Sequence, residues 1–298
     1  MGSETTVLAN QSPTRSALTT EQLSLFDDCG YLLVKGMFNH DEVDRGLEMV
    51  RHALGSGATT IAWHPSFTDR EHTLRIRDAI SQCPELATFL DHPRLVSTLI
   101  ALLSDSVQIL GTEIFVRSCE NRPLEGWHTD GGEYLQRIML APGSQCLQIK
   151  CQIFLTDTSQ DESGNFLLIP RSHRRMPEPH ETCYLDGLNE GLHRGELPDD
   201  VTTIHAAPGD ALLFPYSLWH AVGPNRLQPR ITLIFRYGQL WHRPNDYTRQ
   251  PAHLLERFSP RLRRMFGDLG DDPHPLEFYK PQDQACVMSV SADSERDR

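Results

Sequence analysis

Residues 208–214 are Pro208-Gly209-Asp210-Ala211-Leu212-Leu213-Phe214, a turn that leads into a short apolar run. Similar runs of β type recur from residue 107 onward, with turn residues between them; they cover 107–117, 146–156, 165–169, 201–206, 211–215 and 230–238. Short strands separated by turns are typical of a β-sandwich or jelly roll. The sequence therefore predicts a mostly β fold for its central part.

Helical signals dominate the residues before 107. Thr19-Thr20-Glu21-Gln22 has the form of a capping box, which predicts a helix that ends at Gly30. Asn39, with Glu42 three positions later, predicts the start of a second capped helix. The other expected elements are a strand at 31–34, a loop at 55–73 and helical runs at 79–91 and 92–103. Helices should therefore flank the β core.

The length of the chain favours one domain. It has 298 residues, of which 39% are apolar, and this is enough for one core of the double-sheet kind. We expect a single domain at 19–280, between a disordered tail at 1–18 and a polar tail at 281–298. Its expected parts are a helical part at 19–105, a jelly-roll core at 106–240 and a C-terminal extension at 241–280. A homo-oligomer stays possible.

Net charge and cysteine content disfavour several classes of protein. A formal net charge of −12 argues against nucleic-acid binding, which needs a basic face, and gives no support for binding to an anionic membrane. No apolar stretch is long enough to span a membrane, and no secretory signal is visible. The seven cysteines form no Cys-x-x-Cys pair, so a zinc ribbon or disulfide framework is disfavoured and a cytoplasmic location is expected.

A metal site is suggested by the segment Trp127-His128-Thr129-Asp130. Side chains at i and i+2 of an extended segment point to the same face, so His128 and Asp130 could meet one cation. The His-x-Asp pattern alone is a weak signal, because it often occurs by chance. His220 follows the expected strand at 211–215, but it is one of 14 histidines and could equally be a core residue.

Arg230 starts the apolar strand Ile231-Thr232-Leu233-Ile234-Phe235. Burying a guanidinium without a partner is costly, so an arginine in this position is expected to have one. The partner could be the carboxylate of a ligand, held by the planar fork of the guanidinium. It could also be one of the 40 acidic residues of the chain. These residues alone leave both possibilities open.

Four segments together resemble the phytanoyl-CoA dioxygenase family of iron(II)/2-oxoglutarate-dependent oxygenases. They are Phe26 to Val34, Trp127 to Asp130, Asp161 to His173, and Pro208 to His220 and on to Arg230. The segments occur in the order of the family with similar spacing, and the resemblance runs from about Leu23 to Gly238. It implies a core with the double-stranded β-helix, or jelly-roll, fold.

The resemblance also implies an iron(II) site of two histidines and one carboxylate. His128, Asp130 and His220 match the three ligands, and no catalytic residue beyond them is expected. Such a set occupies one face of the metal and leaves positions open for co-substrate and oxygen. Arg230 matches the residue that binds the distal carboxylate of the co-substrate 2-oxoglutarate. Thr129 and Arg75 match positions that also contact the co-substrate.

By the same resemblance, the chain is expected to be an oxidoreductase, a 2-oxoglutarate-dependent dioxygenase. Its substrate would be a small organic molecule, such as an intermediate of specialised metabolism. A carbon–hydrogen bond would be oxidised by hydroxylation, desaturation or cyclisation, with O2 and 2-oxoglutarate consumed and succinate and CO2 released. Asp130 favours these outcomes over halogenation, because related halogenases have a small residue in its place. The substrate pocket could be lined by aromatic residues, with Trp127, Tyr134, Trp219 and Trp241 as candidates.

The sequence departs from the family pattern at two places. Arg171-Ser172-His173 stands where Gly-Ser-His is common, and His173 is expected to be a structural turn residue. Asn225-Arg226-Leu227 lacks a small hydroxyl residue that often contacts the co-substrate. Two other functions stay open: a cupin-type metal enzyme that does not use 2-oxoglutarate, and a catalytically silent partner subunit. The cupin alternative would not need Arg230, and a silent subunit could lose the metal ligands freely.

Overall fold

The computed structural model describes residues 18–55, 73–131, 135, 138, 140–176 and 184–269, and the strands in this part form two antiparallel sheets. The larger sheet has the spatial order β1 (Leu32–Val34), β8 (Ala211–Pro215), β5 (Gln148–Phe154), β10 (Arg230–Gln239), β3 (Val107–Arg117) and β2 (Thr73–Arg77). The smaller sheet has the order β4 (Glu125–His128), β9 (His220–Val222), β6 (Phe166–Leu168) and β7 (Thr202–Ile204). Two facing sheets with flanking helices confirm the predicted jelly-roll fold class.

Helices precede, interrupt and follow the strands. They are α1 (Thr20–Cys29), α2 (His40–Gly55), α3 (Ala79–Gln82), the 3-10 helix η1 (Pro84–Leu86), α4 (Ala87–Leu90), α5 (Pro93–Leu102), the 3-10 helix η2 (Ser172–Arg174), α7 (Asp186–His193), α8 (Ala252–Leu255) and α9 (Pro260–Met265). The predicted capping box of α1 is present, because the side chains of Thr19 and Gln22 each accept from the other's backbone N–H. Gly30 ends α1 with φ +82°, in the left-handed region that glycine adopts without strain.

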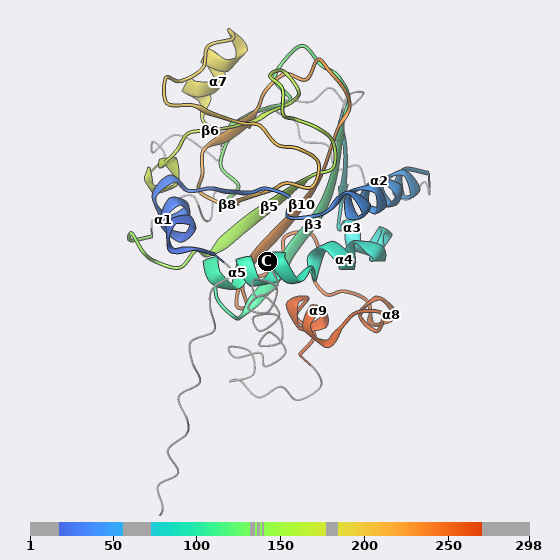
Figure 1. The fold of residues 1–298 in the computed structure, drawn as a ribbon. Helices are drawn as coiled ribbons and strands as arrows, with labels where there is room; N and C mark the ends of the chain where they lie inside the picture. Colours follow the sequence, from blue (N-terminus) through green and yellow to red (C-terminus); the bar gives the residue numbers. More distant parts are fainter. Residues whose placement is uncertain are drawn as a thin grey trace, which may run out of the picture.

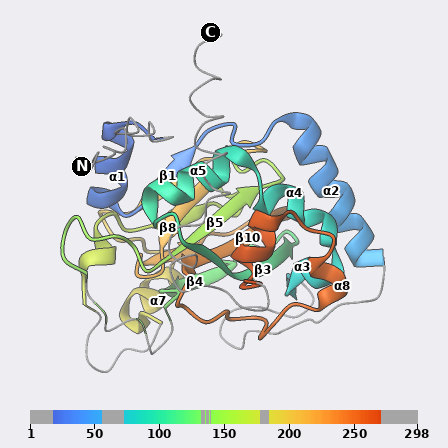
Figure 2. The same cartoon turned by 90° about the horizontal axis from the view of Figure 1, so that it is seen from below.

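Three apolar clusters join four layers: the helices, the larger sheet, the smaller sheet, and α7 with its neighbours. The largest joins the outer face of the larger sheet to the helices, for example through Val50, Leu99 and Phe235. A second cluster, which includes Phe166 and Phe214, lies between the two sheets. A third packs α7 and its neighbours against the outer face of the smaller sheet. Figure 1 accordingly shows α7 at the opposite end of the molecule from α5, α8 and α9, and Figure 2 shows α4, α5 and α8 lying across the strands.

The structure corrects the expected elements in several places. Residues 73–77, at the end of the expected loop, form the edge strand β2, which pairs with β3. The expected helical run 79–91 is divided into α3, η1 and α4, because Pro84 lacks the N–H that would continue α3. The short helices α7, α8 and α9 were not expected. Leu18, placed at the end of the expected tail, is buried in the largest cluster.

The proposed domain boundaries remain predictions. The expected tail at 281–298, and all of the expected tail at 1–18 except Leu18, lie outside the described residues. Among the helices of the described part, none combines the length and apolar character needed to cross a membrane.

Candidate metal centre

The smaller sheet places the two histidines of the predicted metal site side by side. His128 ends β4, His220 begins β9, and the two residues are directly opposite in the antiparallel pair, with ring centroids 4.2 Å apart. Asp130 is held nearby because its N–H donates to the carbonyl of Tyr216 at 2.8 Å. The Asp130 Oδ1 atom lies 3.7 Å from His128 Nε2, and Oδ2 lies 3.5 Å from His220 Nε2. One ligand atom from each residue lies within 4.8 Å of the other two, so the three side chains could hold one metal ion.

Hydrogen bonds orient both imidazoles toward this point. His128 Nδ1 lies 2.7 Å from the carbonyl of Gly126, and His220 Nδ1 lies 2.9 Å from the carbonyl of Leu218. A carbonyl can only accept, so Nδ1 carries the proton in each ring and Nε2 keeps a lone pair for a metal. Asp130 Oδ2 is buried without a hydrogen-bond partner in the described part of the chain. Two imidazole nitrogens and one carboxylate oxygen that are free in this way fit iron(II).

Burial and neighbouring charges keep His220 and Asp130 in the protonation states that a metal requires. Burial, with a smaller contribution from the adjacent His128, lowers the pKa of His220 to about 3, so the His220 imidazole is neutral at pH 7. Burial alone would raise the pKa of Asp130, but Lys150, His220 and His128 together hold it well below its usual range. The ring of Phe166 stacks on His220, with centroids 4.9 Å apart and planes inclined by 11°. This apolar wall limits the access of water.

Lys150 is a neighbour of the site that the sequence reasoning missed. Its Nζ atom lies 2.5 Å from Asp130 Oδ1, and both side chains are buried. Lys150 sits in β5 between Gln148 and Gln152, and all three point toward the smaller sheet. Polar residues at every second position of a buried strand indicate a polar inner face, and this pattern could have identified Lys150 from the sequence. The ammonium leaves Oδ2 of Asp130 as the oxygen available to a metal.

We expect Lys150→Met to destabilise the metal-free protein by about 3–5 kcal/mol, because it leaves the Asp130 carboxylate buried without a cation. Added iron(II) should restore part of the free energy of unfolding, since it supplies a new positive charge. Urea denaturation under nitrogen, with and without iron(II), measures both effects. In the control, Arg257→Met breaks an exposed ion pair with Glu85 and should cost less than about 1 kcal/mol. Equal losses in the two variants would contradict the prediction.

Arg230 lies on the inner face of the larger sheet with 1% of its surface exposed. Its Nε and Nη2 atoms are buried and lack hydrogen-bond partners in the described part of the chain. The nearby carboxylate of Glu125 is bonded to Arg117, at 2.5 Å. Burial, with a smaller contribution from the charge of Arg117, lowers the pKa of Arg230 to about 9. A buried cation with unused donors is suited to receive the carboxylate of a ligand.

The space for Arg230 depends on Gly164. A Cβ atom at this position would lie 2.7 Å from Arg230 Cδ, and Gly164 has φ +73°, a conformation that is strained for other residues. We expect Gly164→Ala to displace Arg230 and to weaken 2-oxoglutarate binding about tenfold, as measured by calorimetry. Gly195→Ala is the matched control, since Gly195 has φ +78° and nothing within 4 Å of the added atom. A similar change of affinity in both variants would show that backbone strain alone is responsible.

The other predicted contacts with the co-substrate have different surroundings. Thr129 is buried, and its hydroxyl has no hydrogen-bond partner among the described residues. Arg75 is on β2, where its Nη2 donates to Glu113 and its guanidinium lies 5.1 Å from the centre of the Phe115 ring. Its Nε is buried and unpartnered in the same part of the structure. Arg75 is therefore partly committed to Glu113, whereas Thr129 is free to contact a ligand.

The aromatic residues suggested for the substrate pocket differ in position. Trp127 is fully buried in the cluster beneath α7, and Trp241 is 60% exposed and stacks on His242. Trp219 packs partly buried against the same cluster as Trp127, and Tyr134 lies outside the described residues. None of the three described aromatics is thus an obvious wall of the metal site.

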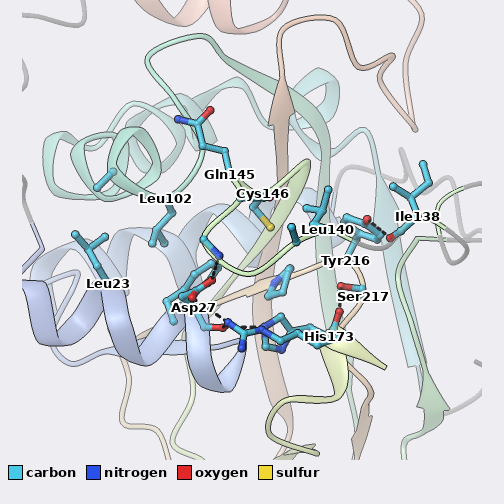
Figure 3. Close-up of a pocket in the computed structure, with 17 residues that line it drawn as sticks. Leu23, Asp27, Leu102, Ile138, Leu140, Gln145, Cys146, His173, Tyr216 and Ser217 are labelled. Atoms are coloured by element: carbon cyan, nitrogen blue, oxygen red, sulfur yellow. Dashed lines mark hydrogen bonds and ion pairs between the residues drawn. The ribbon is translucent and has the colours of Figure 1, made fainter. Parts of the chain in front are cut away.

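A separate hollow lies between α1, α5, residues 138 and 140–146, and the segment 215–217 (Figure 3). Its polar groups are largely engaged with one another. The Tyr216 hydroxyl donates to the carbonyl of Ile138, and His173 Nε2 lies 3.0 Å from the carbonyl of Asp27. His173 belongs to η2, and this contact with α1 agrees with the expected structural role. Through the backbone of Tyr216, this hollow borders the segment that positions Asp130.

Comparisons with known proteins place the chain among characterised relatives. The family model described as phytanoyl-CoA dioxygenase (PhyH) matches residues 26–229. Dioxygenase cdmA of Talaromyces verruculosus is 28% identical over 152 residues, which cover 49% of this chain and only 45% of that protein. Ectoine dioxygenase of Bordetella bronchiseptica is 22% identical over 293 residues and covers 84% of this chain and 89% of that protein.

Among solved structures, HygX from Streptomyces hygroscopicus with nickel, 2-oxoglutarate and hygromycin B bound has a similar fold. The TM-score is 0.60 at 20% sequence identity, over 80% of this chain and 94% of HygX. At this identity, the likeness concerns the fold. HygX, which shares this fold, has nickel and 2-oxoglutarate bound.

Proposed function

The chain belongs to the phytanoyl-CoA dioxygenase family and is a 2-oxoglutarate-dependent dioxygenase, and from this premise we propose that it oxidises a carbon–hydrogen bond of a small organic molecule. The reaction would be a hydroxylation, desaturation or cyclisation that releases succinate and CO2. Two relatives support a small organic substrate, because one is named for ectoine and the other has hygromycin B bound. An intermediate of specialised metabolism is the substrate class that we favour.

The proposal assigns iron(II) to His128, Asp130 and His220. The observation that carries it is the convergence of the three side chains on one point, with both Nε2 atoms and one carboxylate oxygen free to bind a metal. Burial favours the neutral form of His220, and the neighbouring positive charges favour the ionised form of Asp130; these are the forms that coordinate metals. No other group of at least three histidine, cysteine or acidic side chains among the described residues is arranged in this way.

The proposal assigns the distal carboxylate of 2-oxoglutarate to Arg230. The unused Nε and Nη2 donors could bind both oxygens of a carboxylate in the planar arrangement that arginine favours. Thr129 and Arg75 are proposed as additional contacts, with the Arg75 Nε as its available donor. Each assignment gives a buried polar atom a partner that the described residues do not supply.

When bound, iron(II) and 2-oxoglutarate supply the oxidising chemistry, in which O2 is reduced while the co-substrate loses CO2 and becomes succinate. The protein's own residues orient and shield these groups. The carbonyls of Gly126 and Leu218 fix the tautomers of the two histidines, and Lys150 holds Asp130 in place. The rings of Phe166 and Phe214 limit the access of water to His220. This division of roles requires no further acid or base.

Succinate formation tests the proposal. Purified protein incubated with iron(II), ascorbate, 2-oxoglutarate and air should produce succinate, even if slowly in the absence of substrate. Omission of iron(II), or the variant His128→Ala, should reduce the rate to that of the blank. The variant His205→Ala, which removes a half-exposed histidine from another part of the molecule, should behave as the unaltered protein does. Succinate that persists in His128→Ala would exclude that residue as a ligand.

The same assay distinguishes the alternatives left open by the sequence. A cupin-type enzyme would bind the metal but would produce no succinate from 2-oxoglutarate. A silent partner subunit would have neither activity. The protein has a complete set of three potential ligands and a buried arginine whose Nε and Nη2 donors find no partner among the described residues, which favours the first proposal over both.

A further inference from the structure

Gln148 is a buried polar residue of β5 that neither the metal ligands nor the co-substrate contacts account for. None of its surface is exposed. The oxygen and the nitrogen of its side-chain amide both lack hydrogen-bond partners among the described residues. A buried amide normally finds partners, since leaving its donor and acceptor unpaired is costly. Two such atoms in one side chain suit Gln148 to bind a molecule from outside the protein.

The strand β5 places Gln148 beside the metal site. Gln148 and Lys150 point to the same face, about 7 Å apart along the strand, and Lys150 Nζ lies 2.5 Å from Asp130 Oδ1. The backbone provides a second link through Tyr216. Its N–H donates to the carbonyl of Gln148 at 3.2 Å, and its carbonyl accepts from the N–H of Asp130 at 2.8 Å. Gln148 is therefore held next to the carboxylate assigned to iron(II).

Gln148 and Arg230 lie on opposite sides of Lys150. Gly238 is directly opposite Gln148 in the antiparallel pair of β5 and β10, whereas Arg230 is at the other end of β10. A 2-oxoglutarate molecule that reaches from the metal ligands toward Arg230 therefore extends away from Gln148. The side of the metal site that Gln148 occupies is left for the organic substrate.

His242 adds a second unpartnered polar group next to Gln148. A Cβ atom at Gly238 would lie 3.3 Å from His242 Nδ1, so the imidazole lies over the glycine that pairs with Gln148. His242 is buried, and its Nδ1 atom has no hydrogen-bond partner in the described part of the chain. The exposed ring of Trp241 stacks on His242, with centroids 5.6 Å apart and planes inclined by 6°. This corner of the inner face is therefore polar and adjoins the surface.

The burial of Gln148 is shared by the other residues assigned to ligands. Arg230, His220 and Thr129 are also buried, so the whole site is shielded from solvent. In such an environment a hydrogen bond is strengthened, and a ligand that leaves a buried group unpaired is strongly disfavoured. A contact with Gln148 would thus select among substrates.

We propose that Gln148 binds an amide group of the organic substrate, so the substrate is a primary carboxamide or a lactam. A glutamine amide presents an acceptor and a donor side by side, and such a substrate amide presents the complementary donor and acceptor. An ester lacks the N–H that Gln148 Oε1 requires, and a carboxylate would set its negative charge against that oxygen. This inference rests on the proposed function, since it assigns the substrate class of that same site.

Matched pairs of amides and esters test the proposal without knowledge of the true substrate. The probes are 2-quinolinone with coumarin, isoindolinone with phthalide, and phenylacetamide with methyl phenylacetate. Binding is measured by ligand-observed NMR to protein that contains zinc(II) in place of iron and is saturated with 2-oxoglutarate, which occupies the Arg230 site. At least one amide should bind about tenfold or more tightly than its ester, as expected for a paired rather than an unpaired buried group.

Variants then assign the preference to a residue. Gln148→Met keeps the length of the side chain without its polar atoms and should remove the preference for the amide. Gln228→Met is the matched control, because Gln228 is exposed and donates to the carbonyl of Asp157; it should keep the preference. Equal binding of amides and esters, a preference that survives in Gln148→Met, or no amide with a Kd below about 1 mM would each overturn the proposal.

Thermal unfolding of Gln148→Met checks that the amide is unpaired before a substrate binds. Methionine removes two unpaired polar atoms at similar size, so the Tm of the substrate-free protein should rise by about 2 °C or more. An unchanged or lower Tm would mean that water or protein groups already satisfy Gln148, and this would overturn the proposal. Failure of the proposed function would appear separately, as absence of 2-oxoglutarate binding to the unaltered protein.

Discussion

Asp130→Asn should reduce the affinity for iron(II) more than about a hundredfold and abolish succinate formation. Even residues outside a ligand set typically change metal affinity by about 10- to 100-fold, and a ligand itself should have a larger effect. Asparagine keeps the shape of the side chain but removes the charge that a divalent metal requires. Elemental analysis after dialysis against iron(II), together with the succinate assay, measures the two losses.

The same substitution should also destabilise the metal-free protein, because Lys150 then remains buried without its counter-ion. The double variant Asp130→Asn/Lys150→Met removes both charges and should recover stability relative to either single variant. It should not recover iron binding. This combination separates the two roles of Asp130. Removing both charges should restore the stability but should not restore iron binding.

Iron binding that survives in Asp130→Asn would exclude the carboxylate as a ligand. Recovery of iron binding in the double variant would also contradict the assignment of Asp130 as a ligand. It would mean that iron binds without this carboxylate once the ammonium of Lys150 is removed. His205→Ala serves as the control for the metal analysis, since that histidine is 3.6 Å from Asp161 and belongs to another part of the surface.

Much of the β core could be predicted because its signals are local. The expected runs 107–117 and 211–215 have the same bounds as β3 and β8, where β-branched and apolar residues lie between clear turns. The edge strand β2 was missed because Thr73–Arg77 has no turn that separates it from the preceding loop, and its pairing with β3 defines it. The helix α7 contains Gly187 and Gly191, which lower helix propensity, so local sequence disfavours it.

Local sequence patterns likewise predict only part of the candidate site. The positions of His128 and Asp130 on one face follow from their spacing, whereas the selection of His220 depends on the register of β4 with β9. That register is a long-range feature, and only the family resemblance indicated it. The contact of Lys150 with Asp130 was missed for the same physical reason, because it joins two sheets whose relative placement no local pattern specifies. The unused donors of Arg230 likewise became evident only when Glu125 was found with Arg117.

Arg230→Met should raise the Kd for 2-oxoglutarate by about a hundredfold or more, because it removes a charged, two-pronged partner of the carboxylate. The same substitution should stabilise the protein that has no co-substrate bound. Arg230 is buried, two of its donors lack partners among the described residues, and burial is the main cause that lowers its pKa to about 9, so without co-substrate this guanidinium is a desolvated and poorly compensated charge. An apolar side chain of similar length should raise the free energy of unfolding by about 1 kcal/mol or more.

Calorimetry with 2-oxoglutarate and thermal unfolding with and without it measure these opposite effects. The unaltered protein should gain stability from the co-substrate, and Arg230→Met should be more stable at the outset but gain little. Arg226→Met is the control, since Arg226 is half-exposed, pairs with Glu162 and should change neither quantity appreciably. Unchanged 2-oxoglutarate affinity in Arg230→Met would favour the cupin alternative, because such an enzyme has no use for a buried guanidinium that recognises a dicarboxylate. Reduced affinity with intact iron binding would place Arg230 in the co-substrate site and keep the metal ligands separate from it.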